Sequence, residues 1–347
     1  MITDRDWIEK LIEQAIFRIR PDIKDVDLNQ EKITEIVDKT LPAIIDLIEA
    51  DILSKSKKIL NREQRTRTAF KKGLNKKWQS AFQLLELFIG FNREYAEVVS
   101  YYYREKNSSD IKFETLLRLQ ARACQIADEI YTLICNGFAD GALARWRSLY
   151  EIAVLAEFLS DKPTELFQKY LDYYFVENYY EAIEYQKNCT MLSYEPLPEK
   201  EFEEIVQCKD KQQDKYGANF LKPYGWASDY LPKGKCNFSG MEEMCSFNEY
   251  KSFYKLANNY VHCGAKGFMF KLGLRDSEEV LLAGPSDYGF ADPAQYTALF
   301  LHIISSTLSD FDPYLEDVVY SSIRERMVKQ ISDEFVNIQN EFEKIDS

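Results

Sequence analysis

Apolar residues recur every three to four positions through most of the chain, whereas the strict two-residue alternation of strands is nearly absent. This periodicity predicts a mainly α-helical protein with a multi-helix, bundle-like domain. Pro42 is expected to kink or divide the second of the predicted helices. The predicted helices span residues 3–20, 29–60, 78–106, 111–136, 141–160, 163–191, 199–215, 246–263, 293–309 and 321–345.

Two local signals interrupt the helical pattern. Residues 268–272 and 280–282 are short apolar runs joined by a polar turn, which predicts one small β-hairpin. The run Asn-Ser-Ser-Asp at residues 107–110 is typical of a turn followed by a helix cap. One helix is therefore expected to end before this turn and the next to begin directly after it.

The 347 residues are long enough for a sizeable core and accessory parts. We predict N-terminal accessory helices over 1–77, a helical core domain over 78–312 and a C-terminal helix over 313–347 that packs on the core. The accessory part includes a basic segment, residues 55–77, whose positive charge contrasts with the acidic remainder of the chain.

Charge is distributed unevenly along the chain. The net charge is −13, which argues against non-specific affinity of the whole protein for nucleic acid. The basic segment 55–77, however, contains ten basic residues and one acidic residue, a net charge of +9 that leaves −22 for the remainder. Several interpretations stay open: an RNA-binding or protein-docking segment, a solvated helix, or a contact to the protein's own acidic surface.

Composition also limits location and cofactors. No apolar run reaches the roughly 18 residues of a membrane-spanning helix, and the charged N-terminus lacks an export pattern, so we expect a cytoplasmic protein without membrane contact. The seven cysteines contain no Cys-x-x-Cys pair, which indicates free thiols. A zinc site built from Cys236, Cys245, His262 and Cys263 has unsuitable spacing, so no metal and no cofactor are expected.

His262 is a candidate general base, because the chain has two histidines and imidazole titrates near neutral pH. Asn258 lies one helical turn before it, and Lys266 follows in a glycine-rich corner that could approach a phosphate. The alternative is that His262 satisfies the C-terminus of its helix. The other histidine, His302, lies in an apolar run and is expected to be a core or interface residue.

A second candidate group precedes the apolar run at residues 152–156. Arg147 and Glu151 are four residues apart and fall on one helix face, with Arg145 close by. They form either a surface ion pair worth about 0.2–0.5 kcal/mol or a semi-buried pair that orients a histidine and a phosphate. The sequence does not decide between these alternatives.

Aromatic residues are concentrated in the predicted helix 163–191, where they serve packing, a dimer interface or base stacking. The aromatic residues are Tyr170, Tyr173, Tyr174, Phe175, Tyr179, Tyr180 and Tyr185.

The chain lacks the phosphate-loop, Rossmann, serine-hydrolase and zinc-protease motifs. Their absence removes support for the common nucleotide-hydrolase, oxidoreductase, esterase and metalloprotease classes.

Several separated motifs resemble a bacterial family known as domain of unknown function 5677, over about residues 78–311. They are Gly-Ala-Leu-Ala-Arg-Trp-Arg-Ser-Leu-Tyr-Glu at 141–151, Tyr-Gly-Trp-Ala at 224–227, Tyr-Lys-Leu-Ala at 254–257 with Val-His at 261–262, Lys-Gly at 266–267 and Leu-Ala-Gly-Pro-Ser at 282–286. This resemblance implies no activity by itself.

The chain is more distantly similar to HEPN (higher eukaryotes and prokaryotes nucleotide-binding) helical domains. That resemblance implies RNA or nucleotide as a partner, a homodimer, and a metal-independent ribonuclease or a nucleotide-binding component of a toxin or phage-defence system. Asn258 and His262 match its motif, but Ala257 stands where the motif has arginine, so Arg147 would supply the cation.

In the ribonuclease hypothesis, His262 acts as base, Arg147 holds the phosphate and Glu151 orients the histidine. Arg145, Asn258 and Lys266 are the expected substrate-binding residues. The alternative is a non-catalytic helical interaction or oligomerisation module in which Arg147, Glu151 and His262 form a buried structural network. The environment of His262 is the feature that would separate the two.

Overall fold

The computed structural model describes residues 30–106, 110–262, 264–275, 280–309 and 315–346. The chain divides into two compact units, Met1–Gly73 and Leu74–Ser347. The helix predicted at 3–20 lies outside the described residues. In the described part, the second predicted helix is present, and Pro42 lies inside it.

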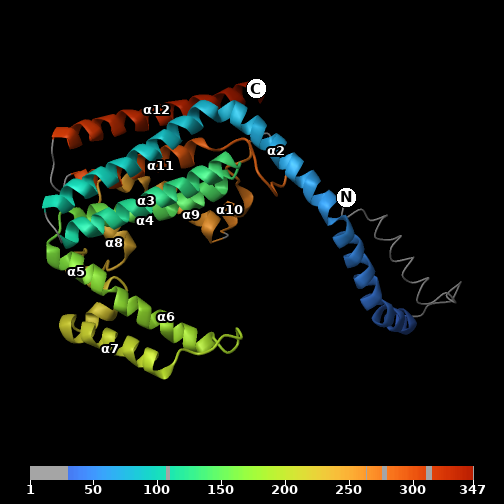
Figure 1. Ribbon diagram of the computed structural model, residues 1–347, viewed down its shortest axis with the longest axis horizontal. Helices are drawn as coiled ribbons and strands as arrows, with labels where there is room; N and C mark the ends of the chain where they lie inside the picture. The colour runs from blue at the N-terminus through green and yellow to red at the C-terminus, as the bar shows by residue number, and fades with distance from the viewer. Residues whose placement is uncertain (1–29, 107–109, 263, 276–279, 310–314, 347) are drawn as a thin grey trace. The chain divides into compact units, whose positions relative to one another are not determined.

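The described residues are mainly helical, as the periodicity predicted (Figure 1). Three short 3₁₀ turns, η1 (Ala218–Leu221), η2 (Gly225–Ala227) and η3 (Asn248–Tyr250), connect the helices in the second half. The helices are α2 (Gln30–Lys106), α3 (Ile111–Cys135), α4 (Ala139–Ser160), α5 (Thr164–Asp172), α6 (Tyr174–Asn188), α7 (Glu199–Tyr216), α8 (Phe238–Glu242), α9 (Lys251–Val261), α10 (Ala265–Met269), α11 (Ala291–Ser309) and α12 (Leu315–Asp346).

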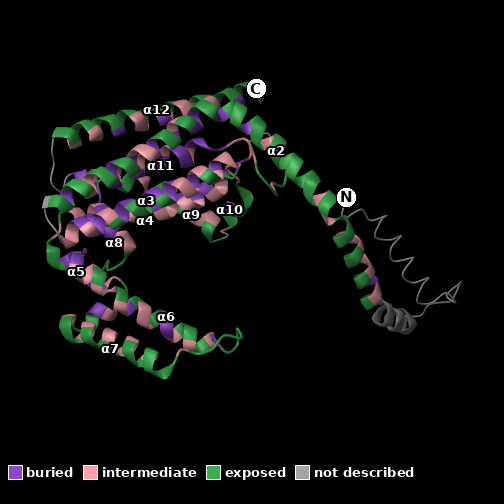
Figure 2. Ribbon diagram, viewed as in Figure 1, coloured by how far each residue is buried: buried purple, intermediate pink, exposed green. Residues whose placement is uncertain are grey.

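The core of the second unit is built from α3, α4 and α11, which pack against one another, with α12 on α11 and α9 on α4. Figure 2 shows the buried residues concentrated along α3, α4 and α11, whereas α7 is largely exposed. On α4, Leu143, Trp146 and Tyr150 are fully buried. This burial explains why the helix has apolar residues on several faces.

A second cluster joins the part of α2 after Gly73 to α12. Trp78 is fully buried, and its ring lies 5.1 Å from that of Phe290 and 5.7 Å from that of Phe335. The indole N–H donates to the carbonyl of Asp287 at 2.9 Å. Large apolar and aromatic contacts of this kind contribute most of the stability of a helical core.

Polar groups inside this core are hydrogen-bonded across three helices. Gln120 of α3 donates to the Ser305 hydroxyl of α11 at 2.8 Å, and Ser305 donates to the Asn92 side-chain oxygen of α2 at 2.7 Å. Asn92 in turn donates to the carbonyl of Phe88 at 2.7 Å. These bonds offset much of the cost of burying the polar atoms and fix the relative register of the three helices.

One prediction about local structure is wrong. The β-hairpin is not present, and no strand occurs among the described residues. Phe268 belongs to the short helix α10, and the N–H of Leu272 donates to the Asp140 carboxylate at 2.7 Å instead of to a strand partner. An isolated hairpin is marginal in water, so contacts with the helical core decide the conformation of this segment.

Helix boundaries also differ from the prediction. The basic segment was expected to follow one helix and precede another, but it is helical throughout, within α2. Residues 61–72 contain neither proline nor glycine, so nothing in them interrupts the backbone hydrogen bonds. Conversely, the predicted helix 163–191 is divided at Tyr173 into α5 and α6.

His302 of α11 is partly buried, and burial lowers its pKa to about 4, with the Arg324 guanidinium adding to the effect. The unfolded chain binds a proton near pH 6.5, so between pH 6.5 and 4 the unfolded state binds more protons and stability falls as the pH falls. We expect this residue to contribute up to about 3 kcal/mol of stability above pH 6.5 that is lost by pH 4.

Urea denaturation of the wild type and of His302→Leu at several pH values tests this expectation. The variant should lose less stability than the wild type on going from pH 7 to pH 4.5, because leucine does not titrate. Parallel pH dependence of the two proteins would contradict it.

Candidate functional site

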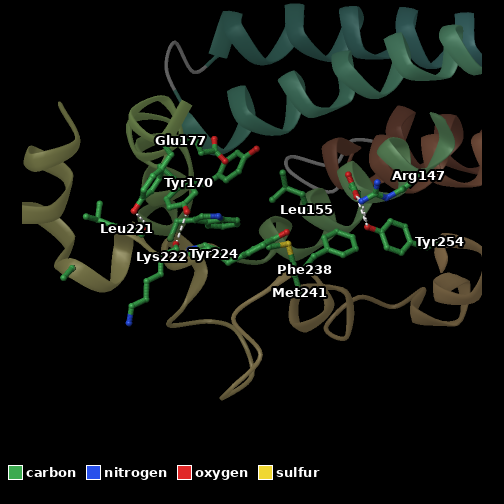
Figure 3. Close-up of a pocket in the computed structure, with 16 residues that line it drawn as sticks. Arg147, Leu155, Tyr170, Glu177, Leu221, Lys222, Tyr224, Phe238, Met241 and Tyr254 are labelled. Atoms are coloured by element: carbon green, nitrogen blue, oxygen red, sulfur yellow. Dashed lines mark hydrogen bonds and ion pairs between the residues drawn. The ribbon is translucent and has the colours of Figure 1, made fainter. Parts of the chain in front are cut away.

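A cavity of about 920 Å³ opens in the second unit where α4, α8 and α9 meet the α5–α6 region and the η1–η2 segment (Figure 3). Its size is within the range of small-molecule binding sites. It is lined by Arg147, Glu151, Leu155, Tyr170, Tyr173, Glu177, Tyr180, Ala218, Leu221, Lys222, Pro223, Tyr224, Trp226, Phe238, Met241 and Tyr254.

At one end of the cavity, three polar side chains contact one another. The helical spacing of α4 places Arg147 and Glu151 on one face, and their side chains form an ion pair at 3.0 Å. Tyr254 of α9 donates to the Glu151 carboxylate at 2.8 Å and accepts from Arg147 at 3.3 Å (Figure 3). The Arg147 side chain is 24% exposed and that of Glu151 38%, so the pair is semi-buried, not a solvated surface pair.

This group has unused hydrogen-bonding capacity. The Nε atom of Arg147 is buried and has no hydrogen-bond partner among the described residues. Burial and the hydrogen bond to Glu151 raise the pKa of Tyr254 to about 12, so its hydroxyl is protonated at neutral pH. The guanidinium, carboxylate and phenol together offer a ligand both donors and acceptors.

Behind Tyr254, a second row of residues holds the ring in place. Tyr254 stacks on Tyr150 at a centroid distance of 5.0 Å, and Phe238 lies 5.2 Å away. The Tyr150 hydroxyl donates to the buried Glu242 carboxylate at 2.8 Å, and Lys251 pairs with the same carboxylate at 2.6 Å. The charge of Glu242 is therefore compensated, and the row is stiffened by hydrogen bonds.

The opposite wall depends on a tight backbone turn at Tyr224 and Gly225. Tyr224 has φ 58° and ψ 16°, a left-handed conformation that costs about 1–2 kcal/mol for a residue with a Cβ. A Cβ on Gly225 would lie 2.4 Å from the carbonyl oxygens of Asn219 and Phe220, so this position needs glycine. Strain of this kind is often found at binding sites.

Two hydrogen bonds and one ring contact fasten this wall to the helices above it. Tyr173 and Tyr180 donate to the carbonyls of Lys222 and Leu221 at 2.9 and 3.4 Å. Trp226 meets Tyr170 edge to face at a centroid distance of 4.9 Å. Of the aromatic residues in the predicted helix 163–191, Tyr170, Tyr173 and Tyr180 thus contact this wall, and all three line the cavity.

The lining side chains include two cations and two carboxylates. Lys222 bonds to the side-chain oxygen of Asn219 at 2.8 Å, and its amine points away from the other lining residues in Figure 3. Burial raises the pKa of Glu177, and the nearby carboxylate of Glu181 adds to the effect. Arg147 is therefore the cation that faces the cavity from the described residues.

Of the predicted catalytic residues, Arg147 and Glu151 line the cavity, but His262 does not. His262 caps the C-terminus of α9, where its side chain is exposed and its N–H donates to the carbonyl of Asn258 at 2.9 Å. The side-chain oxygen of Asn258 is buried without a hydrogen-bond partner among the described residues. The structure thus brings Tyr254, not His262, to Arg147 and Glu151.

The other two predicted substrate-binding residues also lie outside the cavity lining. Lys266 is exposed on α10. Arg145 forms an ion pair with Glu129 of α3 and donates to the Ser148 hydroxyl at 3.1 Å. Arg145 therefore joins two helices of the core.

Sequence reasoning missed Tyr254, Tyr224 and Trp226 as lining residues. A signal for them was available, because the motifs at 141–151, 224–227 and 254–257 are the segments that carry the family resemblance, and all three line this cavity.

No helix among the described residues is long and apolar enough to cross a membrane. The described residues also contain no group of three or more histidine, cysteine, aspartate or glutamate side chains placed to hold a metal ion.

Fold and cavity together define a mainly helical protein with an aromatic-lined cavity. Residues 113–280 match the model of a family of unknown function, DUF5677. The resemblance predicted from the motifs is thereby confirmed over a shorter segment than 78–311. Comparison with curated proteins and with solved structures gave no match.

Proposed function

We propose that the chain binds a nucleoside or a nucleotide in the cavity between α4, α9 and the η1–η2 segment. The observation that carries this proposal is the combination of one inward-facing arginine with seven aromatic lining residues in about 920 Å³. The aromatic residues are Tyr170, Tyr173, Tyr180, Tyr224, Trp226, Phe238 and Tyr254.

Each part of a nucleotide has a suitable environment there. A base has a flat π-surface, and stacking on an aromatic side chain contributes about 1–3 kcal/mol. Ribose and base edges offer donors and acceptors that suit the Glu151 carboxylate and the tyrosine hydroxyls. A phosphate is best placed at Arg147, whose planar guanidinium binds such groups with paired hydrogen bonds.

The balance of charge favours ligands with few phosphates. Glu151 pairs with Arg147, and Glu177 adds a second carboxylate. Because the Lys222 amine points away, the lining has no excess of cations for a triphosphate. We therefore expect nucleosides and nucleoside monophosphates to bind more tightly than the corresponding triphosphates.

Calorimetric titration of the wild type, Arg147→Gln and Arg145→Gln with nucleosides and their mono- and triphosphates tests this proposal. We expect Arg147→Gln to weaken monophosphate binding by about 10- to 100-fold, as for one lost hydrogen bond to a charged group, with little change for the nucleoside. Arg145→Gln is the matched control, since Arg145 lies on the same helix but contacts Glu129.

Equal affinities of the two variants for the monophosphate, or no saturable binding of any nucleoside or nucleotide, would overturn the proposal. Thermal unfolding of both variants shows whether either substitution has disturbed the fold.

The ribonuclease prediction stays separate from this proposal. It requires His262 beside the phosphate that Arg147 holds, because proton transfer needs direct contact or one intervening water. His262 is exposed at the end of α9 and does not line the cavity. Nucleotide binding, by contrast, needs only the residues that do line it.

A further inference from the structure

Residues 55–73 of the basic segment belong to the first unit and lie within the helix α2. Residues 61–69 of α2 are exposed at every position, so this stretch has no buried face. A helix stretch with neither a buried face nor an apolar stripe gains no stability from packing, and its charged surface faces water.

Five cations of this stretch lie on one face of the helix. Lys55, Lys58, Arg62, Arg65 and Lys72 are all exposed and follow one another at intervals of three, four, three and seven residues. Because an α-helix has 3.6 residues per turn, these intervals place the side chains in one stripe. With a rise of 1.5 Å per residue, the stripe is about 26 Å long. We call it the basic stripe.

Few acidic groups neutralise the basic stripe. Asp51 pairs with Lys55 at its beginning, and Glu63 contacts Arg62 at 3.4 Å. Lys58, Arg65 and Lys72 have no ion-pair partner among the described residues. Because the helix holds neighbouring cations of the stripe three to seven residues apart, they repel one another unless an external anion neutralises them.

Polyanions with a regular spacing of charges fit this surface better than a membrane does. A helix that lies on a lipid bilayer needs bulky apolar side chains on one face. Residues 61–72, which hold three of the five stripe cations, contain one bulky apolar side chain, that of Phe70, and it is not exposed; Leu60 before them is a single exposed leucine. A coiled-coil partner is disfavoured for the same reason, because its seam requires apolar residues at the a and d positions.

Between nucleic acids, a duplex fits better than a single strand. Proteins that bind single strands without sequence preference place aromatic side chains under successive bases. Residues 55–72 contain one aromatic residue, Phe70, which is not exposed. A duplex presents its phosphates on the outside, where lysine and arginine contact them without stacking.

We propose that the basic stripe of α2 binds the phosphate backbone of a double-stranded nucleic acid without reading its sequence. The chain outside the basic segment has a net charge of −22 and repels phosphates. The basic segment is the local exception that makes such binding feasible. Counterion release then makes the affinity steeply salt-dependent, with log K falling against log salt by about 0.9 per phosphate contact.

The test measures binding of the full-length protein to a fluorescein-labelled 20-base-pair duplex, as RNA and as DNA, by anisotropy at several salt concentrations. Lys58→Gln/Arg65→Gln/Lys72→Gln removes three stripe cations. Lys57→Gln/Arg67→Gln/Lys71→Gln is the matched control, since it removes two lysines and one arginine from other faces of the same helix. Glutamine keeps helix propensity in both.

We expect wild-type binding that is independent of sequence, with a slope of about −4 to −5 for five contacts. The stripe variant should bind with a slope shallower by about 2 to 3 and an affinity at least tenfold lower, whereas the control should lose less than threefold. Equal losses in the two variants would reject the stripe in favour of diffuse charge attraction.

Two further outcomes would also overturn the proposal. One is absence of duplex binding at 50 mM salt, and the other is tighter binding to vesicles containing phosphatidylserine than to the duplex. Because the stripe lies in the first unit and the nucleotide cavity in the second, each proposal can fail without the other. Calorimetry with a mononucleotide on the stripe variant confirms this independence, since its cavity is intact.

Discussion

Replacement of Trp78 by alanine is expected to lower the free energy of unfolding by about 3–5 kcal/mol, as for large buried aromatic residues in general. Trp78 is fully buried, and rings from α2, from the residue before α11 and from α12 surround it, with Phe82 at 6.3 Å and Phe342 at 5.7 Å. Alanine leaves a cavity among these rings and removes the indole hydrogen bond to Asp287. The measurement is urea denaturation followed by circular dichroism.

Two control variants separate packing from the hydrogen bond. Trp78→Phe keeps most ring contacts and should cost about 1–2 kcal/mol, near the value of a lost hydrogen bond plus a small cavity. Tyr101→Ala removes an aromatic residue that is 62% exposed and should change stability by less than about 0.5 kcal/mol. A loss below about 1 kcal/mol in Trp78→Ala would mean that the ring cluster does not hold α12 to the core.

The helices were predictable because their signal is local. Asp110 was identified as a cap, and its carboxylate accepts from the N–H groups of Lys112 and Phe113, the first turn of α3. The same holds for α4 and α11, whose apolar residues lie within single uninterrupted segments. The existence of a helix depends on residues that are close in sequence, and their periodicity can be recognised in the amino-acid sequence itself.

The wrong predictions involve segments whose conformation is decided by distant residues. Residues 268–272 have the composition of a strand, but the Asp140 carboxylate, from the start of α4, takes the N–H of Leu272. The division at Tyr173 likewise lies where α5 and α6 must each pack, α5 on α3 and α6 on α7. Neither partner can be identified from local periodicity.

The candidate site was likewise predictable only where its contacts join residues that are close in sequence. Arg147 and Glu151 are one turn apart on one helix, so their pairing follows from helical geometry. Tyr254 lies about a hundred positions later, and nothing in its neighbourhood indicates that its hydroxyl bonds to Glu151. His262 was favoured by its residue type and by resemblance, yet its place at the C-terminal end of α9 leaves its side chain exposed.

The second large effect is expected at Gly225. A Cβ there would lie 2.4 Å from two backbone oxygens, which cannot move aside as a flexible side chain could. Gly225→Ala must therefore displace the turn that holds Tyr224 and Trp226, at a cost of about 1–3 kcal/mol or more. Under the proposed function, Gly225→Ala should also weaken nucleotide binding by about tenfold or more, because the aromatic rings of Tyr224 and Trp226, on which a base would stack, move.

Gly90→Ala provides the matched control, since it adds the same methyl group where a Cβ meets nothing within 4 Å. Gly90 lies inside α2, so alanine there should raise stability by about 0.5–1 kcal/mol and leave nucleotide affinity unchanged. Thermal unfolding and calorimetric titration of both variants distinguish the outcomes. If Gly225→Ala binds nucleotide as the wild type does while losing stability, the turn supports the fold alone and the ligand contacts other walls of the cavity.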